Sequence, residues 1–594
     1  MRRTVAVLAV GALIALAGCI GIGSEEVGDD LGEANSKASQ YPADAELNTS
    51  GQWSSTVDDG TYEIGEPEQV MVTSSAGDDV SIGIVKPADL GPDEQVPVVA
   101  DIGPYYGELE GDVDNPDDAR LDNFLIENLV PHGYAVAMVS VPGTGDSGGC
   151  EDYFGPREQV AVDDAVTFLA ELDVSTGDVG LIGKSYDGST PWEAAAQGNE
   201  NLKTIVPLAG IPSFQELHFM NGTAETRAGW LNFAYWSFGV AKGGMLGPLY
   251  YDGANWLERP DPVWAERACP AVGEHLANGA SGTATGGQDP TGYWEERSFK
   301  PEVLENYDGS VFVVHGLQDW NVHPDMVTHV WDDLEQLDGE RKLWFGQWSH
   351  IYPDRPDQVE NCGACPHPDA VRWDFAETLK RWFDSELKGQ DVDTGPTVWS
   401  QDDEGGWHAS EDWPPRDAET HSLYLGDGSL STNTTEDGSA TLFTPAGTTA
   451  PAEPTSQLTW TSQPLDADKR IVGEPRFHFT ATPTSPDGNL EASLYDVDED
   501  GERKRIGHGY MNLRYAAGGD DPQPVTPGEQ LDVEMQLFPL DTVVEEGHQL
   551  ELVLEQDSPL PRPSGPIEVH WGGDDGSALT YEDTHDHQTG LPWR

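Results

Sequence analysis

The chain has 594 residues, too many for one domain, and its 37% hydrophobic residues and 19 tryptophans exclude a wholly disordered protein. Its 106 acidic and 31 basic residues give a formal net charge of -75, and such a surface repels nucleic acid and anionic lipid headgroups. The acidic residues are dispersed through otherwise globular patterns. This dispersion is typical of a protein adapted to high salt, where a short Debye length screens self-repulsion.

The N-terminus has the features of an export signal. Two arginines precede an apolar run, Val5–Leu16, which is followed by Ala17-Gly18-Cys19. The pattern predicts a lipoprotein signal over residues 1–19, with Cys19 as the lipidated first residue, and the arginine pair suggests the twin-arginine route. The alternative is an uncleaved membrane anchor, because Ile20–Gly23 extends the apolar run. Both interpretations place the protein at the outer face of the cell membrane.

An acidic stretch and then a regular α/β pattern follow. Residues 20–61 are rich in Ser, Gly, Asp and Glu without periodicity, which predicts a flexible tether. Over residues 62–209, a predicted hairpin at Gln69–Val85 precedes strands that alternate with helices. The predicted elements are strands at Val96–Ile102, Tyr134–Val141, Val179–Ile182 and Thr204–Leu208, and an amphipathic helix at Val160–Leu172. Such alternation predicts a parallel sheet covered on both faces.

Residues 210–300 interrupt this alternation with aromatic residues and glycine-rich joints, which predicts a helical cap over the sheet edge. An ordinary packed subdomain with an aromatic core is the alternative. The α/β domain resumes over residues 301–392. Its predicted elements there are strands at Val311–Gly316 and Lys342–Gly346 and a helix at Asp369–Lys388.

Residues 393–594 carry many short strands between Gly, Thr, Asp and Pro turns, which predicts a β-sandwich or jelly roll. Within it, Asp496–Gly501 begins like a calcium-binding loop. The twelfth position of that loop needs a bidentate Glu, and Gly507 stands there instead. The sequence therefore predicts a hairpin turn.

Four cysteines besides Cys19 remain, and an even number outside the cytoplasm favours disulfides with three connectivities open. They are Cys150, Cys269, Cys362 and Cys365. The Cys-x-x-Cys pair could hold a metal or act in redox chemistry. No second pair of ligands follows at zinc-like spacing, so a structural disulfide is favoured, and we expect neither a metal nor a cofactor.

The stretch Gly183–Gly188 joins a buried strand to a helix that Ser189 and Thr190 are predicted to cap. A serine bounded by glycines between a strand and a helix is the setting of a nucleophile elbow. The spacing here is Gly-x-Ser-x-x-Gly rather than the commoner Gly-x-Ser-x-Gly. By itself the stretch is therefore also compatible with an ordinary strand-to-helix turn.

Two later strand ends supply the base and the carboxylate that a serine nucleophile needs. Asp319 lies in a loop just after one predicted strand, and His350 lies just after the next. The order Ser185, Asp319, His350, with each residue at the carboxyl end of a strand, is that of an α/β-hydrolase triad. The sequence therefore predicts an α/β-hydrolase fold with a helical cap insertion and a C-terminal jelly-roll domain.

From about residue 65 onward, these motifs resemble the Xaa-Pro dipeptidyl-peptidase and cocaine esterase family of serine hydrolases. The resemblance rests on Gly183–Gly188, His315–Val322, Gly346–His350, a Pro104-Tyr105 loop and the entry into the jelly roll at Trp407–Leu425. The Gly-x-Ser-x-x-Gly spacing is this family's own form. Asp187 departs from the family pattern, which has an apolar residue there.

The resemblance implies a role for each site residue. Ser185 attacks the carbonyl, His350 takes the proton and returns it to the leaving group, and Asp319 holds the imidazole. The backbone N–H of Tyr186 and the hydroxyl of Tyr105 bind the oxyanion. In the alternatives, Tyr105 merely packs in a turn, or the neighbouring Tyr106 takes its place.

The predicted function is an exported serine hydrolase that acts on a small peptide or ester. Lys184 and the Asp319–Val322 run resemble the dipeptidyl-peptidases more than the cocaine esterases. Such a peptidase needs a carboxylate for the substrate's α-ammonium group, and Glu216 and Glu225 are the candidates. The alternatives are hydrolysis of small esters or acyl amides, and a non-catalytic surface protein that binds glycans or a partner. The sequence makes no prediction of the oligomeric state.

The charge pattern predicts that the protein loses stability at low ionic strength, because carboxylates repel one another over longer distances as the Debye length grows. We expect the thermal unfolding midpoint to fall steadily as NaCl is lowered from molar to millimolar concentration at constant pH. An unfolding midpoint that is unchanged or higher at low salt would contradict salt adaptation.

Overall fold

The computed structural model describes residues 57, 60–105, 121–224, 269, 292–354, 370–443, 457–518, 522–556, 565–572 and 576–584. Several predictions concern residues outside these ranges, namely the export signal with Cys19, nearly all of the tether, Tyr106, Glu225, most of the cap, and Cys362 with Cys365.

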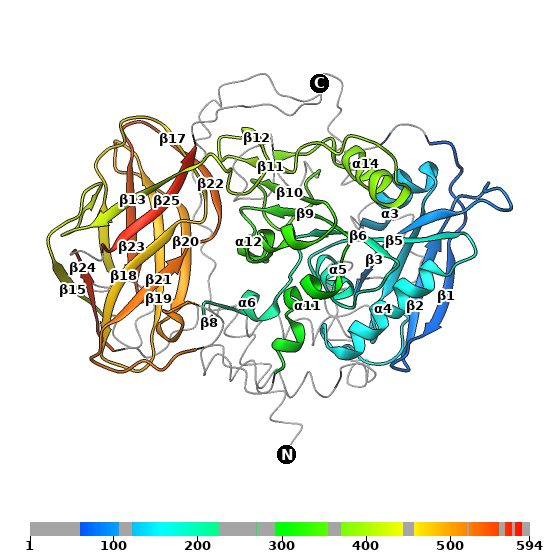
Figure 1. Cartoon of the computed structure of the whole chain (residues 1–594), viewed down its shortest axis with the longest axis horizontal. Helices are drawn as coiled ribbons and strands as arrows, with labels where there is room; N and C mark the ends of the chain where they lie inside the picture. The colour runs from blue at the N-terminus through cyan, green and yellow to red at the C-terminus, as the bar shows by residue number, and fades with distance from the viewer. Residues whose placement is uncertain are drawn as a thin grey trace, which may run out of the picture. The chain divides into compact units, whose positions relative to one another are not determined.

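A ten-stranded mixed sheet forms the first large element, in the order β1-β2-β4-β3-β5-β6-β9-β10-β11-β12 (Figure 1). The pairs from β4 through β11 are parallel, whereas β1, β2 and β12 join the sheet antiparallel. The bounds are β1 Glu68–Thr73, β2 Asp79–Val85, β3 Val96–Gly103, β4 Ala135–Ser140, β5 Ser175–Lys184, β6 Leu202–Leu208, β9 Ser310–Gly316, β10 Arg341–Gly346, β11 Val398–Gln401 and β12 Trp407–Ser410. This sheet confirms the predicted hairpin and the predicted parallel core.

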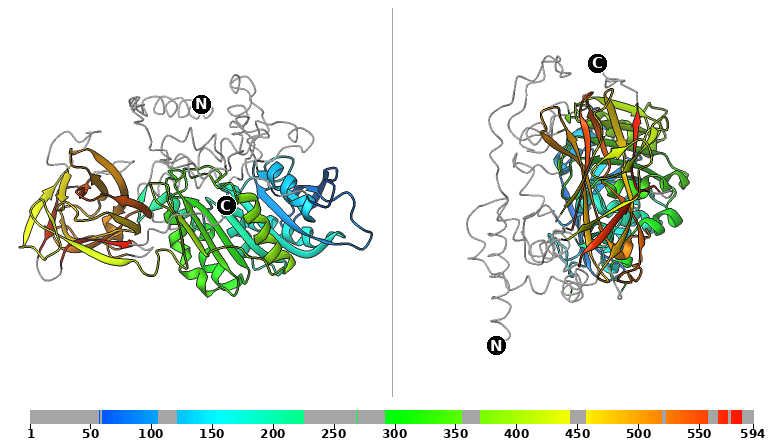
Figure 2. Two further views of the ribbon diagram at one scale, coloured as in Figure 1. Left: turned by 90° about the horizontal axis from the view of Figure 1, so that it is seen from above. Right: turned by 90° about the vertical axis from the view of Figure 1, so that its left-hand side faces the viewer.

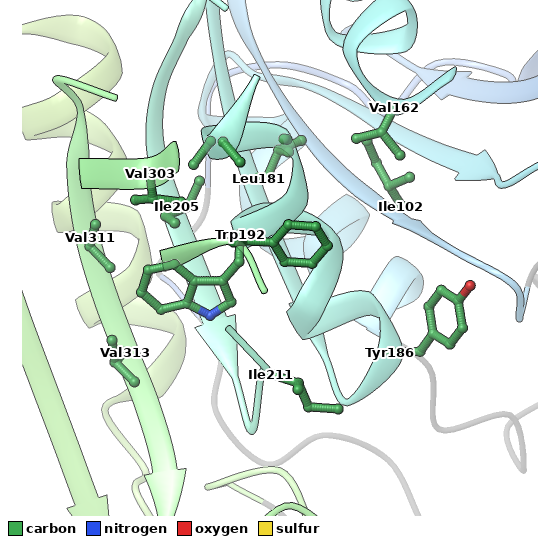
Figure 3. Close-up of a cluster of buried hydrophobic side chains, with 14 of the residues drawn as sticks. Ile102, Val162, Leu181, Tyr186, Trp192, Ile205, Ile211, Val303, Val311 and Val313 are labelled. Carbon is green, nitrogen blue, oxygen red and sulfur yellow. The ribbon is translucent and has the colours of Figure 1, made fainter. Parts of the chain in front are cut away.

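Helices cover both faces of this sheet. Successive residues of a buried strand point to opposite faces, so neighbouring residues of β5 pack against different helices. Leu181 of β5 lies in a cluster with residues of α4, α5, α11 and α12, whereas Ile182 lies in a second cluster with α3 and α14. Figure 3 shows Trp192 of α5 within the first cluster. The bounds are α3 Leu121–Leu129, α4 Pro156–Ala170, α5 Tyr186–Ala196, α11 Lys300–Asn306, α12 Asp325–Trp331 and α14 Phe375–Lys388.

The C-terminal part is a β-sandwich of a nine-stranded and a four-stranded sheet, coloured yellow to red in Figure 2. Its strands pair antiparallel, and an isolated parallel bridge joins Ser429 and Thr461. Both sheets contribute side chains to one apolar cluster. The bounds are β13 Glu419–Leu425, β14 Leu430–Ser431, β15 Gly438–Leu442, β16 Gln457–Thr461, β17 Lys469–Gly473, β18 Arg476–Pro483, β19 Asn489–Val497, β20 Arg503–Asn512, β21 Leu531–Gln536, β22 Leu540–Val544, β23 Gln549–Glu555, β24 Ile567–Trp571 and β25 Ala578–Thr584.

Two details of this region bear on the sequence predictions. The first two strands after residue 393, β11 and β12, extend the large α/β sheet, so the sandwich itself begins at β13.

The calcium-like stretch, Asp496–Gly501, forms the end of β19 and the turn that joins it to the antiparallel strand β20. There, the Asp498 carboxylate accepts hydrogen bonds from the backbone N–H groups of Asp500 and Glu502, at 2.9 and 2.8 Å. The predicted hairpin turn is confirmed.

The sequence left three ways to pair the four cysteines. In the structure, Cys150 and Cys269 form a disulfide. The backbone N–H of Cys269 also donates to the carbonyl of Glu151 at 3.1 Å. Among the helices within the described ranges, none combines the length and the apolar character that crossing a membrane requires.

Candidate active site

Ser185 occupies a sharp turn between β5 and α5, with φ 67° and ψ -119°. Residues other than glycine seldom adopt a positive φ, and a nucleophile elbow is a known exception. The Ser185 N–H donates to the carbonyl of Leu208, the last residue of β6, at 3.0 Å. The turn is therefore fixed to the end of the neighbouring strand.

Two glycines make this turn sterically possible. A Cβ atom at Gly183 would lie 2.2 Å from the carbonyl oxygen of Asp187, and one at Gly188 would lie 2.3 Å from the carbonyl oxygen of Leu208. Both distances are far below van der Waals contact, so no side chain fits at either position. The Gly-x-Ser-x-x-Gly spacing thus follows from two close backbone approaches, on either side of the serine.

The start of the following helix differs from the prediction. Ser189 and Thr190 do not cap it, because α5 begins at Tyr186 and already contains Pro191. Proline lacks the N–H that would bond to the carbonyl four residues earlier, which belongs to Asp187. The Thr190 hydroxyl lies 3.0 Å from that carbonyl, but its shorter hydrogen bond, at 2.7 Å, is to the carbonyl of Ile102 in β3. Proline commonly marks the first turn of a helix, which is why the sequence pattern placed the start too late.

Asp187, the departure from the family pattern, is accommodated by a glycine on another strand. Its side chain is buried, and a Cβ atom at Gly103, the last residue of β3, would lie 1.5 Å from its Oδ1 atom. The space that lets a carboxylate lie beside the elbow therefore exists only because position 103 is glycine.

Asp319 and His350 are in direct contact. The Asp319 Oδ2 atom accepts a hydrogen bond from His350 Nδ1 at 2.7 Å. The other oxygen, Oδ1, accepts from the backbone N–H groups of Asn321 and Val322 at 2.8 and 2.9 Å. With both oxygens engaged, the carboxylate is fixed and orients the imidazole, as a triad carboxylate does.

The loops that carry these two residues are bonded to each other. The Leu317 N–H donates to the Gly346 carbonyl at 2.8 Å, and the Gln318 N–H donates to the Trp348 carbonyl at 3.1 Å. The buried Trp348 ring lies over Gly346, where a Cβ atom would be 1.7 Å from the indole. The loop after β9 and the loop after β10 therefore hold a fixed relative position.

The β-sandwich also contacts the histidine loop. The Gln347 side chain donates to the carbonyls of Gln401 and Asp541 at 2.8 and 2.9 Å, and Asp541 belongs to β22. The Asp541 carboxylate forms a buried two-point ion pair with Arg470 at 2.7 and 2.6 Å. Arg470 also donates to Ser400 of β11 at 3.0 Å. The C-terminal region thus supports the segment that ends in His350.

Strand register brings Ser185 to the same sheet edge as the other two residues. Lys184 pairs with Leu208 of β6, Leu208 pairs with Val314 of β9, and the last residues of β9 and β10 pair with each other. In addition, the Lys184 Nζ atom donates to the His350 carbonyl at 3.4 Å. The structure therefore gathers the three predicted residues at the carboxyl ends of neighbouring strands.

Burial and charge set the protonation of the pair. Burial by itself raises the pKa of Asp319, but His350 and the hydrogen bonds outweigh it and lower this pKa to about 2. Burial lowers the pKa of His350, and the Asp319 carboxylate only partly opposes this. The imidazole is consequently neutral near neutral pH, which is the form that accepts a proton.

Tyr186 and Tyr105, the predicted oxyanion donors, lie next to each other. Tyr186 is the first residue of α5, where backbone N–H groups have no partner within the helix and the helix dipole is positive. The half-buried Tyr105 ring meets the Tyr186 ring edge-on, with 6.5 Å between centroids. The structure thus brings both tyrosines to the elbow.

Glu158 of α4 also belongs to this site, although it was not among the predicted residues. Its carboxylate accepts hydrogen bonds from the Tyr186 hydroxyl at 2.8 and 2.9 Å and from the Phe154 N–H at 3.0 Å. The Phe154 ring stacks on Tyr186 at 3.9 Å. Burial raises the pKa of Glu158 to about 7. An acidic residue on the apolar face of an amphipathic helix was the signal available in the sequence.

Glu216 lies in a different place from the candidate triad. It belongs to α6 (Phe214–His218) and lines a cavity of about 1740 Å³ between α6, α11, α12 and strands β18 and β21, which Ser185, Asp319 and His350 do not line. Burial lowers the pKa of His329 in the same wall, but the carboxylates of Glu216, Asp325 and Glu474 outweigh it and raise this pKa to about 10. Glu216 is thus engaged electrostatically with His329.

Comparison with known proteins agrees with this geometry. Residues 76–352 match the family described as X-Pro dipeptidyl-peptidase (S15 family), and residues 391–560 match the X-Pro dipeptidyl-peptidase C-terminal non-catalytic domain. The chain belongs to the S15 family. It is therefore a serine hydrolase, as the resemblance implied.

Relatives of this S15 chain are distant in sequence. A protein of Streptomyces avermitilis is 27% identical over 562 residues, which cover 80% of this chain and 76% of that protein. A Xaa-Pro dipeptidyl-peptidase of Lacticaseibacillus casei is 26% identical over 508 residues, covering 72% of this chain and 59% of that enzyme.

Solved structures establish the fold. A CocE/NonD family hydrolase from Staphylococcus aureus matches with a TM-score of 0.65 at 17% identity, covering 87% of this chain and 94% of that one. An α-amino acid ester hydrolase matches with a TM-score of 0.64 at 18% identity, covering 92% and 100%. The predicted α/β-hydrolase fold with a C-terminal β-sandwich is confirmed.

The pKa directions predict that activity of this S15 chain falls on acidification with a midpoint below about 6.5, the ordinary pKa of histidine. Protonation of His350 would remove the predicted base, and its lowered pKa shifts that loss to lower pH. The measurement is kcat/KM against pH, and a wild-type midpoint above 7 would contradict the predicted direction.

In Asp319→Asn, we expect kcat to fall by about 10³- to 10⁴-fold, because the predicted base loses the carboxylate that orients it.

Proposed function

We propose that the chain is a peptidase that releases Xaa-Pro dipeptides from the N-termini of peptides through an acyl-enzyme mechanism. The observation that carries the proposal is the 2.7 Å hydrogen bond between Asp319 and His350, at the sheet edge where Ser185 adopts a positive φ. Family membership, and a named dipeptidyl-peptidase among the relatives, support the peptide bond as the target.

In the proposed mechanism, the Ser185 hydroxyl attacks the carbonyl carbon of the proline while His350 accepts the hydroxyl proton. Asp319 holds the imidazole and stabilises the imidazolium that forms. The imidazolium then donates its proton to the departing amine, and the acyl group stays on the serine. Water, deprotonated by His350, attacks this ester and releases the dipeptide, and the proton returns to Ser185.

The developing oxyanion would be stabilised by the Tyr186 N–H and the Tyr105 hydroxyl. The bond from the Tyr186 hydroxyl to Glu158 and the stacking of Phe154 on the Tyr186 ring hold this residue in one orientation. A donor that is already fixed in place needs no reorganisation in the transition state, which is why such groups contribute strongly to catalysis.

We further propose that the protein is exported and held at the outer face of the cell membrane by a lipid on Cys19, in a high-salt environment. The basic start, the apolar run and the small residues before Cys19 support export and lipidation. The dispersed acidic residues support the environment. Of the two carboxylates predicted for the substrate's ammonium group, Glu216 lines a cavity that contains none of the triad residues, and Glu225 lies outside the described residues.

A two-part experiment tests the enzyme and its bond class. A fluorophosphonate probe in high salt should label the wild type and not Ser185→Ala, whereas absent or equal labelling would favour a non-catalytic binding protein. Release of a chromophore from an Ala-Pro amide should then exceed release from a simple aryl ester in kcat/KM. The reverse preference would assign the chain to hydrolysis of small esters.

Two matched tyrosine variants test the oxyanion donors. We expect Tyr105→Phe to lower kcat by about 10²- to 10³-fold, because a transition-state donor is lost, with little change in KM. Tyr186→Phe keeps its backbone N–H and loses only the bond to Glu158, so its kcat should fall less. If the Tyr105 change has no effect on kcat, the hydroxyl is not a donor.

A further inference from the structure

Lys184 connects the elbow to the histidine loop. It is the last residue of β5 and directly precedes Ser185. Its Nζ atom donates to the His350 carbonyl at 3.4 Å and lies 5.0 Å from the centroid of the Tyr352 ring. The Lys184 side chain, at the end of the strand that leads to Ser185, therefore contacts two residues of the histidine loop, His350 and Tyr352. Because 3.4 Å is long for a hydrogen bond, the larger contribution is that of the positive charge.

The charges around this lysine define its electrostatic effect. The carboxylates of Asp319 and Asp187 face Lys184, and burial lowers its pKa against their attraction. His350 is faced by Asp319, Lys184 and the imidazole of His315. Asp319 favours the protonated imidazole, whereas the lysine ammonium opposes protonation.

The composition of the chain makes this local cation significant. With 106 acidic and 31 basic residues, the protein as a whole attracts protons and so favours protonation of a histidine. Salt screens distant surface carboxylates, but it screens a neighbouring, partly buried charge much less. A lysine ammonium 3.4 Å from the His350 carbonyl therefore offsets the general acidic field where the proposed mechanism requires a neutral base.

We infer that Lys184 is a positioning residue that holds the His350 main chain and keeps the imidazole unprotonated at mildly acidic pH. This inference rests on the proposed catalytic role of His350. The lysine does not react with the substrate. It acts through the base, by a contact to the backbone and by its charge. Its removal should therefore change the pH dependence of the reaction and not only its rate.

The test is the pH dependence of the second-order rate of inactivation by a fluorophosphonate probe in high salt. In Lys184→Met, the acid midpoint should rise by roughly 0.5 to 1 pH unit, which is about a three- to tenfold loss of rate below the midpoint. Lys184→Arg keeps the charge, so its acid midpoint should stay near that of the wild type.

Lys342→Met is the matched control. Lys342 is buried, whereas Lys184 is half-buried, and it lies at the opposite end of β10, where it donates to the Pro396 carbonyl at 2.5 Å. Loss of this buried lysine should leave the acid midpoint unchanged. If Lys184→Met does not unfold cooperatively on heating, Lys184→Gln is measured in its place.

Two outcomes would overturn the inference. One is an unchanged acid midpoint in a folded, uncharged variant of Lys184. The other is an equal rise of the midpoint in Lys184→Arg, which would show that shape rather than charge matters. Because the probe reacts with an activated serine whatever the natural substrate, failure of this inference is distinct from failure of the peptidase assignment. The latter would appear as normal labelling without cleavage of an Ala-Pro amide.

Discussion

The backbone turn at Ser185 is the constraint on which the rest of the site depends. A positive φ at a residue with a side chain is unfavourable, and it persists only when the surroundings enforce it. Here, the bond from Ser185 N–H to Leu208 and the close approaches at Gly183 and Gly188 enforce it. The same turn places Tyr186 at the start of α5 and aims Lys184 toward the histidine loop. The hydroxyl, the proposed oxyanion donor and the proposed positioning charge thus depend on one turn.

The β-sandwich contributes to the site without carrying any of its proposed reacting groups. Through the Asp541 carbonyl it bonds to Gln347, three residues before His350. The ion pair of Arg470 and Asp541 is buried, so loss of either partner would leave an uncompensated charge and destabilise this contact strongly. A domain described in the family as non-catalytic therefore has a physical role here, because it holds the loop that carries His350, the proposed base.

Charge acts at two ranges in this protein. The net charge of -75 is a property of the whole surface, and salt screens it. Inside the site, a few neighbouring groups set the protonation of His350, with the buried Asp319 favouring the imidazolium and the half-buried Lys184 opposing it. The buried carboxylate of Glu158 is used differently, since it accepts the Tyr186 hydroxyl and has a pKa near 7. A highly acidic chain can therefore hold a neutral imidazole and a carboxyl group of raised pKa within one short region.

The sequence by itself determined the alternation of strands and helices, the order Ser185, Asp319, His350 and the glycine spacing, because periodicity and glycine requirements are local properties of the chain. It placed the start of α5 too late, because Pro191 is typical of a first helical turn, whereas in the packed structure the helix begins at Tyr186 and contains the proline. The tertiary structure alone decided that Gly103 makes room for Asp187, that Glu158 meets Tyr186 and that Lys184 meets His350. These pairs lie on different elements, and a sequence pattern carries no information about which elements pack together.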